Sequence, residues 1–310
     1  MKTVLLAGGL GGARLAPALA RVLGARRLSV VANVGDDLEW MGLRVCPDLD
    51  SISYALAGLW DRNRGWGRRG ETFRVRDALS ALGAPSWFNV GDADFALHLE
   101  RSRLLDSGRN LTDATREIAR KLGVRRVSVL PAADAYAPTR FVLRDGRHFE
   151  FQEWYVRTRA RLPLRRIILS RRRASAAALQ ALHEADAVVL GPSNPVTSIG
   201  AILALRGMAA AIRQVARRIA VCPVVIGRPS ADPGIQHHAR ARRLVLEAEG
   251  GYDRPASIAA RYVGLIDRFV LDRSDRAEAP AIRRLGIEPV LSDLLDEGVL
   301  ARRLTELASE

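Results

Sequence analysis

The N-terminal stretch of the chain constrains the fold most strongly. Residues 2–7, KTVLLA, form a short apolar run that ends in a cluster of glycines. Residues 16–25, APALARVLGA, follow with helical spacing, and residues 27–33, RLSVVAN, are a second apolar run. A strand, a glycine turn, a helix and a second strand are typical of the βαβ unit of a parallel sheet.

Later segments repeat this alternation. Residues 140–154 predict a hairpin around Asp145-Gly146, and Pro289 suits residues 286–291 to a sheet edge. We expect a single domain over residues 1–310, of the α/β class, with a doubly wound, mostly parallel, Rossmann-like sheet. The other predicted strands are 125–130, 185–191, 218–227 and 267–272, and the predicted helices are 49–60, 74–82, 92–105, 111–122, 174–184, 198–216, 235–249, 255–265 and 293–308.

Residues 60–122 interrupt the alternation because they contain helical segments and no good strand. They follow the second predicted strand directly. We therefore expect them to form an inserted helical cap subdomain over one end of the sheet.

The charge of the chain needs a separate explanation. The formal net charge is +14, and all but two of the 48 basic residues are arginine. Nucleic-acid-binding proteins concentrate such charge in a stripe and add stacking aromatics, and the sequence shows neither pattern clearly. A solvated basic surface is the first interpretation, and attraction of an anionic substrate is the second.

The cysteine count and hydropathy indicate a cytoplasmic protein without membrane partners. The chain has two cysteines, too few for a disulfide scaffold. No run approaches the roughly 18 apolar residues of a membrane span, and glycines interrupt the first apolar stretch where a signal peptide would continue.

The glycine turn after the first strand is a candidate phosphate site. Four glycines close together let a backbone approach a ligand with free N–H groups. The turn lacks the Gly-Lys-Ser/Thr ending of a P-loop, and Arg14 stands where the third glycine of GxGxxG belongs. A tight turn without a ligand is the alternative. The candidate residues are Gly8, Gly9, Gly11, Gly12 and Arg14.

An acidic cluster follows the second strand, in the segment NVGDDLEWMGLRVCPDLDS. Three interpretations compete: a solvated loop, partners for the protein's own arginines, and a site where a cation meets a phosphate. Asp48 suits the first turn of a helix that begins at Pro47, which is a structural role. Carboxylates beside a substrate phosphate are also the usual setting for Mg²⁺. The acids are Asp36, Asp37, Glu39, Asp48 and Asp50.

Two further segments carry candidate binding residues. In WFNVGDADFALHLERS, Asp92 predicts a helix cap, and His98 shares a helix face with Asp94. Trp87 beside them suits either the core or a stacking role. In VVLGPSNPVTSIG, a buried strand runs into a loop fixed by two prolines, and its many donors favour ligand binding: Ser193, Asn194, Thr197 and Ser198.

Together these segments resemble the 2-phospho-L-lactate transferase family of coenzyme F(420) biosynthesis. The segments GGLGGARLAP, NVGDD, CPDLDS, WFNVGDADFALHL and GPSNPVTSIG occur in the family's order, and RGWGRRGETF and FQEWYVRTRA are similar to family segments. The resemblance extends over nearly the whole chain to about residue 227 and is weaker beyond it.

The resemblance implies a Mg²⁺-dependent phosphotransferase. The acceptor would be a ribityl 8-hydroxy-5-deazaflavin, and the donor a guanosine diphosphate carrying lactate, enolpyruvate or a related three-carbon acid on its outer phosphate. The terminal ribityl hydroxyl would attack that phosphate and GMP would leave. These small molecules are the implied partners, without nucleic acid, and a homodimer stays open.

The resemblance also assigns roles to individual residues. Asp50 would be the central catalytic acid, and the metal would be held by Asp36, Asp37, Asp48 and Asp50. Gly9, Gly11, Gly12 and Arg14 would bind phosphates. The nucleotide end of the donor would be held by residues of the GPSNPVTSIG loop: Gly191, Ser193, Asn194 and Ser198. The deazaflavin would lie beneath the helical cap, in a pocket lined by Trp87, Asp92 and His98.

Two departures from the family pattern keep an alternative open. Ala93 replaces an arginine of the usual Gly-Asp-Arg-Asp motif, and RPSADPGIQHHARARR, with His237 and His238, replaces a Gly-Pro-Ala-Asp run. The alternative is a non-enzymatic regulatory protein of the same superfamily that binds a nucleotide sugar. A nucleic-acid-binding protein ranks last, because charge is its only support.

Overall fold

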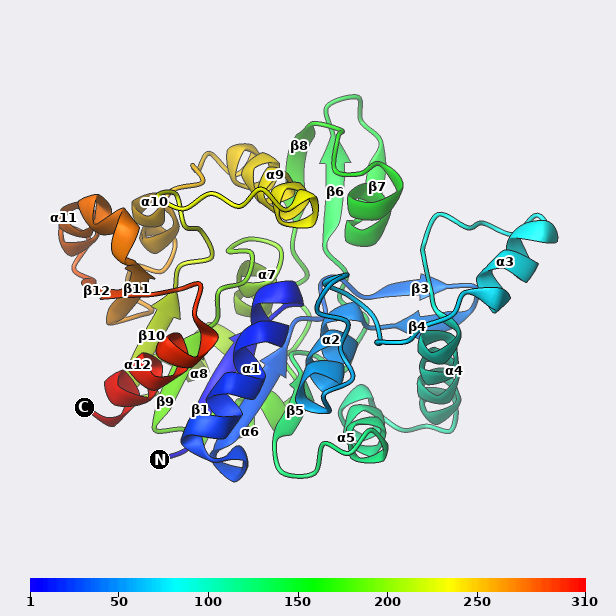
Figure 1. Ribbon diagram of the computed structural model, residues 1–310, viewed down its shortest axis with the longest axis horizontal. Coiled ribbons are helices and arrows are strands. Elements are labelled where there is room, and N and C mark those ends of the chain that lie inside the picture. Colours follow the sequence, from blue (N-terminus) through cyan, green and yellow to red (C-terminus); the bar gives the residue numbers. More distant parts are fainter.

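A computed structural model describes residues 1–310, and its centre is a seven-stranded sheet (Figure 1). All neighbouring strands are parallel. Their order, β12-β11-β10-β9-β1-β2-β5, is the Rossmann order, so the predicted doubly wound α/β class is confirmed. The strands are β1 (Thr3–Ala7), β2 (Leu28–Ala32), β5 (Ser128–Pro131), β9 (Ala187–Leu190), β10 (Arg217–Val221), β11 (Arg268–Asp272) and β12 (Glu288–Ser292).

Helices cover both faces of this sheet. On one face α1, α2 and α12 lie side by side, and on the other α6, α7 and α8 pack together (Figure 1). The helices are α1 (Gly9–Leu23), α2 (Pro47–Leu56), α3 (Arg74–Ala81), α4 (Asp92–Asp106), α5 (Leu111–Lys121), α6 (Ala176–His183), α7 (Ile199–Ala204), α8 (Met208–Arg213), α9 (Pro233–Ala248), α10 (Pro255–Ala260), α11 (Ala279–Arg283) and α12 (Glu297–Ser309).

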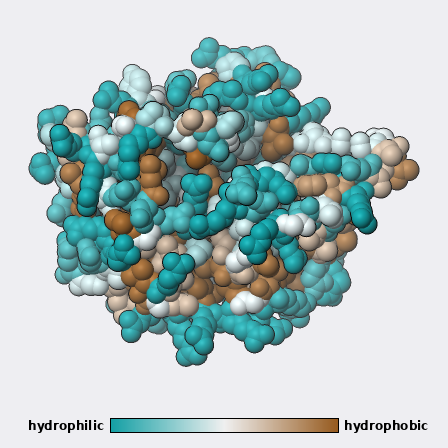
Figure 2. Space-filling model, in the orientation of Figure 1, coloured by the Kyte–Doolittle hydropathy of each residue, from teal (hydrophilic) through white to brown (hydrophobic).

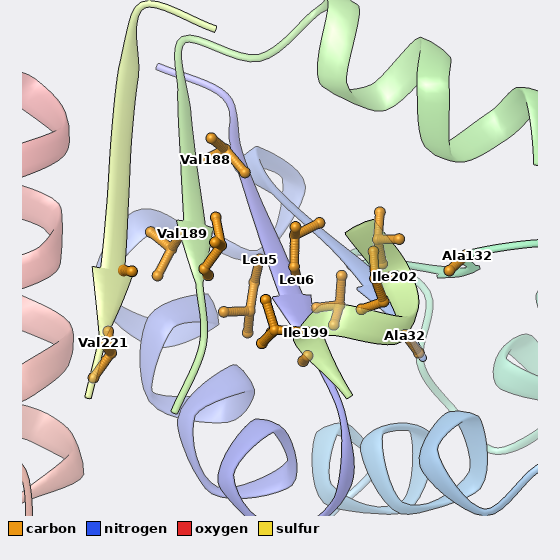
Figure 3. Packing of buried hydrophobic residues seen from close by; sticks show 14 of the residues in the cluster. Leu5, Leu6, Ala32, Ala132, Val188, Val189, Ile199, Ile202 and Val221 are labelled. Carbon is orange, nitrogen blue, oxygen red and sulfur yellow. The ribbon is translucent and has the colours of Figure 1, made fainter. Parts of the chain in front are cut away.

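The central strands are almost entirely apolar, with Thr3 the exception in β1, because both of their faces are covered. Every residue of β1 and β9 is buried, which is typical of parallel sheets and differs from the alternation of a half-exposed strand. In Figure 3, Leu6 of β1 lies near Ile199 and Ile202 of α7. Each such aliphatic side chain contributes about 1.5–3 kcal/mol on burial. The core therefore holds the ends of β1 and β9 rigidly.

Several sequence predictions are confirmed or corrected. The hairpin is present as β6 (Arg140–Leu143) and β7 (His148–Glu150), and β8 (Leu164–Ile168) joins it in a second, antiparallel sheet that the sequence did not indicate. A small hairpin, β3 (Leu38–Trp40) and β4 (Leu43–Val45), was also not predicted. The edge position of β12 is confirmed.

The prediction of one continuous helix over residues 198–216 is wrong. It is divided into α7 and α8, because Gly207 between them adopts a left-handed φ of 94°. Residues 60–122 contain α3, α4 and α5 and no strand. That they form a separate cap subdomain stays a prediction.

An arm built from α3 and the β3–β4 hairpin projects from the body of the molecule (Figure 1). Much of the face in Figure 2 is hydrophilic, and the arm carries some hydrophobic residues. Leu82, which directly follows α3, is 84% exposed. None of the helices combines the length and the apolar character needed to cross a bilayer.

The order of the strands also predicts where a ligand binds. The strand order reverses between β1 and β9, and ligands of open α/β sheets occupy the crevice at such a point. The segments after β1 and β9 touch there: a Cβ added at Gly11 would lie 2.0 Å from the carbonyl oxygen of Pro192.

Gly11→Ala tests this contact. Because backbone on both sides prevents relief, we expect the substitution to destabilise the protein by about 2 kcal/mol, lowering Tm by about 4 °C in a thermal scan. Gly251→Ala is the matched control, since its nearest atom is an ordinary 3.5 Å away. Equal Tm values for the two variants would contradict the tight contact.

Candidate functional site

The carboxyl ends of β1 and β9 are tied together by one serine. The backbone N–H of Gly8 donates to Ser193 Oγ at 3.0 Å, and that hydroxyl donates to the carbonyl oxygen of Gly8 at 2.8 Å. Asn194 is also engaged locally, because its Oδ1 accepts from the N–H groups of Val196 and Thr197. These two predicted nucleotide-binding side chains therefore shape the loop in this structure.

The acidic corner is organised by Asn33, the first residue after β2. Its side-chain amide donates to Asp36 Oδ1 at 2.9 Å and to Asp48 Oδ2 at 3.0 Å. The other oxygen of Asp48 accepts from the N–H of Gly9 at 2.6 Å. Asp48 lies in the first turn of α2, as predicted, but its carboxylate joins that helix to the glycine turn.

Asp36 and Asp48 are buried carboxylates without a basic partner. Burial, followed by the charge of Asp48, raises the pKa of Asp36 well above its usual value. Burial raises the pKa of Asp48 to about 6, against the hydrogen bonds from Asn33 and Gly9. The cost of holding two charges here makes the pair receptive to a cation.

The other acids of the cluster have different surroundings. Asp37 pairs with Arg44 at 3.0 Å and accepts from the Cys46 thiol, and burial raises its pKa to about 7 despite the arginine. Asp50 accepts two hydrogen bonds from the guanidinium of Arg101. Burial raises the pKa of Asp50, and Arg101 opposes that effect.

The structure separates the acids of the cluster by their surroundings. Glu39 is an exposed residue of β3, Asp37 and Asp50 meet the protein's own arginines, and Asp36 and Asp48 remain available to a cation. No three histidine, cysteine or acidic side chains gather as a metal cluster. Of the four aspartates predicted to hold a metal, Asp36 and Asp48 are the two that have no arginine partner, and the metal site itself stays a prediction.

Helix α4 supplies the next group. His98 is 5% exposed, with Nδ1 at 3.3 Å from Arg101 Nη1. Burial and the charge of Arg101 lower the pKa of His98 well below its usual value. Burial raises the pKa of Asp94 to about 7, although it accepts a hydrogen bond from Tyr54 Oη at 2.7 Å.

Asp92 and Trp87 lie elsewhere than expected. The carboxylate of Asp92 accepts from the Thr72 hydroxyl and from the N–H of Val75, so it caps the start of α3. The N-cap of α4 itself is Gly91. Trp87 packs edge-on against Trp40 of the projecting arm, with ring centroids 4.8 Å apart.

One cavity of about 1830 Å³ connects these groups. Its walls combine the glycine turn, the acidic corner, the loop after β9, one side of residues 60–122, and α9. Ten of the fifteen residues to which the resemblance assigns a role line it: Gly9, Gly11, Arg14, Asp36, Asp48, Asp50, His98, Ser193, Asn194 and Ser198. Five others lie outside its walls: Gly12, Asp37, Trp87, Asp92 and Gly191.

Arginines give the cavity a positive side. Arg228, Arg242 and Arg254 line the cavity, and each is paired with a carboxylate. Arg14 and Arg240 also line it and have no carboxylate partner. A negatively charged ligand accompanied by a cation would complement both the arginines on this wall and the Asp36–Asp48 pair on the other.

Three important residues were missed by sequence reasoning. Asn33 had a usable signal, since a polar residue directly follows a buried strand at a sheet end. Tyr54 lines the cavity from α2 but reads as an ordinary core residue. Arg101 is 2% exposed and holds both Asp50 and His98. Nothing in the sequence separates it from the many other arginines.

Known structures share this fold. Two crystal structures of protein BH3568 from Bacillus halodurans superpose with TM-scores of 0.62 and cover at least 98% of both chains. One of them is described as a member of the UPF0052 family. The sequence identities of 16% and 15% limit this likeness to the fold.

Curated relatives are similar over their whole length. The phosphoenolpyruvate transferase of Streptomyces griseus is 34% identical over 325 residues, covering 100% of this chain and 99% of the relative. Those of Mycobacterium sp. strain KMS and Mycolicibacterium smegmatis are 39% and 33% identical, each covering 99% of both chains.

The family model of 2-phospho-L-lactate transferase CofD matches residues 3–303. This match extends beyond the region of strong motif resemblance and includes the cavity walls formed by α9. It confirms the family that the motifs indicated. The chain therefore belongs to the 2-phospho-L-lactate transferase (CofD) family of transferases.

Proposed function

We propose that the protein transfers a phospho-three-carbon-acid group from a guanosine-diphosphate-activated donor to the terminal ribityl hydroxyl of 8-hydroxy-5-deazaflavin, releasing GMP, in coenzyme F(420) biosynthesis. The names of the relatives favour enolpyruvate as the three-carbon acid. The observation that carries the proposal is the meeting of the glycine turn and the Asp36–Asp48 pair inside one large cavity.

The donor's outer phosphate fits beside the glycine turn. Helix α1 has no side-chain cap and no acid within its own first turn. The N–H of Gly8 is bonded to Ser193 and that of Gly9 to Asp48, so a phosphate would meet the remaining first-turn N–H groups and the helix dipole, with a cation between it and Asp48. Arg14 on the same helix adds a cation without a carboxylate partner. The nucleoside would extend along the loop that follows β9.

The residues present suit a Mg²⁺ ion. Two carboxylate side chains, Asp36 and Asp48, lie together without a basic partner, and Mg²⁺ is usually held by one or two carboxylates together with substrate phosphates. Bound there, Mg²⁺ would supply charge neutralisation at the donor phosphates.

The acceptor would occupy the side formed by residues 60–122. Phe88, Asp94 and His98 line this wall, and Tyr54 lines the cavity from α2, where it donates to Asp94; together they offer an apolar surface with a few polar groups. The wall lies next to Asp50 and the acidic corner, so an alcohol of the acceptor can approach the donor phosphorus.

The reaction needs positioning more than covalent chemistry. The acceptor oxygen forms a bond to the outer phosphorus, the bond from that phosphorus to the bridging oxygen breaks, and GMP departs with the electron pair while the hydroxyl proton is released. The protein's part is to align both oxygens and to exclude water.

The direct test is product formation. The purified protein with Mg²⁺, the deazaflavin and enolpyruvyl-diphosphoguanosine should yield the phosphodiester and GMP, detected by mass spectrometry, with the lactyl donor compared in parallel. A folded sample that makes no product with either donor, and whose Tm rises with a uridine-diphosphate sugar but not with GDP, would favour the regulatory alternative.

The charge pair gives a second test. Asp36→Asn keeps the hydrogen bond from Asn33 and removes the repulsion with Asp48, so the metal-free protein should be stabilised by about 1 kcal/mol, raising Tm by about 2 °C. The same variant should lose turnover at least tenfold, because the cation loses a ligand. Asp77→Asn, on the exposed side of α3, is the control that changes neither. An Asp36→Asn variant with unchanged Tm and full turnover would remove the pair from the mechanism.

A further inference from the structure

Helix α9 brings two arginines to the cavity. It packs against β8 (Figure 1), and both Arg240 and Arg243 line the cavity. Arg240 is tethered, because its Nη2 donates to the carbonyl oxygen of Arg159 at 3.1 Å and lies 3.1 Å from His237 Nδ1. Arg243 lines the same wall, but its side chain makes no hydrogen bond or ion pair within the chain. The fold therefore holds Arg240 at the cavity wall and leaves Arg243 free.

Arg159 is an unusual tether. It and Ala160 adopt left-handed φ angles of 53° and 47°, although neither is glycine. Each residue in such a conformation costs of order 1 kcal/mol and persists only where the surrounding structure enforces it. Backbone strain of this kind is concentrated at binding and active sites. Here the strained turn supplies the carbonyl oxygen that fixes Arg240.

The tether leaves most of the guanidinium unpaired. Both contacts involve Nη2, so Nε and Nη1 keep N–H groups without a partner in the chain. Neither nitrogen is a buried unpaired atom. Arg240 is exposed, and it lines the cavity. Its free N–H groups can therefore form charge-assisted hydrogen bonds to a carboxylate or a phosphate of a ligand.

Arg240 lies near the acidic corner and the glycine turn. Burial and then the charge of Asp36 raise the pKa of Tyr155, and the charge of Arg240 opposes them, so both charges act on this one ring. Tyr155 Oη lies 2.7 Å from His238 Nδ1. Burial, together with nearby positive groups that include Arg14, lowers the pKa of His238 to about 4. Arg14, Arg240 and Asp36 therefore surround the same part of the cavity.

The proposed donor carries one negative group besides its phosphates. In the lactyl and enolpyruvyl forms a carboxylate is attached to the carbon that bears the phosphoester oxygen, so one carbon and one oxygen separate it from the outer phosphorus. A cation for this carboxylate must therefore lie close to the phosphate site. The other arginines of the cavity wall are already paired with carboxylates: Arg64, Arg228, Arg242 and Arg254.

We propose that Arg240 is a specificity-determining residue that binds the carboxylate of the three-carbon acid on the donor. This inference rests on the proposed function. Arg14 follows the glycine turn and would meet the phosphates, and Arg243 has no tether, so Arg240 is the cation that is both free and fixed. Because a guanidinium and a carboxylate form strong charge-assisted hydrogen bonds, the site selects donors that carry an acid over donors that carry a neutral group.

Binding of two matched compounds tests this assignment. Lactyl-diphosphoguanosine and the isopropyl ester of GDP differ only in that a methyl group replaces the carboxylate. In calorimetry with Mg²⁺ and without deazaflavin, the wild type should bind the lactyl compound at least about tenfold more tightly than the isopropyl ester. Arg240→Gln should reduce this preference to less than about threefold, because the amide carries no charge. The affinity of this variant for GDP and its Tm should stay close to wild type.

Arg243→Gln is the matched control, since it removes an equal charge from the same helix and the same wall of the cavity. It should keep the full preference for the lactyl compound. Equal losses of preference in the two variants would overturn the proposal, because the positive field of α9 and not a contact with Arg240 would then be responsible. An Arg240→Gln variant that keeps the preference, or that loses affinity for GDP and both esters to the same extent, would overturn it as well.

Turnover separates this inference from the proposed function. If a folded wild type made no phosphodiester from either three-carbon donor, the proposed function would fail and the carboxylate assignment with it. If the wild type made the product, Arg240→Gln should raise KM for the lactyl donor at least about tenfold and change kcat less than about threefold, as expected for a lost binding contact. An unchanged KM in that variant would leave the proposed function standing and remove Arg240 from donor recognition.

Discussion

The buried pair of Asp36 and Asp48 is the constraint on which the site depends. Two carboxylates that share one amide group and have no basic partner raise the free energy of the folded protein while they are charged. The fold holds them because Asn33, the Gly9 N–H and the packed ends of β1 and β2 position them at the switch point of the sheet. A charged ligand can relieve this cost. The pair therefore destabilises the folded protein on its own, and this is consistent with a role in binding a cation.

The other two aspartates of the cluster, Asp37 and Asp50, each form an ion pair with a buried or half-buried arginine. Arg44 neutralises Asp37 outside the cavity, and Arg101 neutralises Asp50 at its wall. The cavity is therefore lined on one side by Asp36 and Asp48, which have no basic partner, and on the other side by arginines that have no carboxylate partner. This arrangement suits a nucleoside diphosphate with a cation better than it suits either ion alone. It also explains how a chain of net charge +14 keeps an acidic pocket.

The sequence predicted the sheet well and the side-chain partners poorly. The glycine turn and the apolar runs identified β1, β2 and β9, because local periodicity reports burial directly. The division of α7 from α8, and the strand β8, depend on packing against distant segments, and no local pattern encodes that. Asp92 illustrates the same limit: the sequence placed it at a helix start, but its carboxylate caps a different helix. The role of Arg101 follows only from where α4 meets α2.

Membership of the CofD family and the geometry of the cavity support each other, since the residues that carry the motifs meet at the point where the strand order predicts a ligand. Proton release on ligand binding tests the central claim most directly. Calorimetry of GDP and Mg²⁺ binding at pH 6, in buffers of different ionisation enthalpy, should show release of protons that declines towards pH 8, because a bound cation lowers the raised pKa values of Asp36 and Asp48. Binding without proton release at pH 6 would show that the cation does not meet this pair.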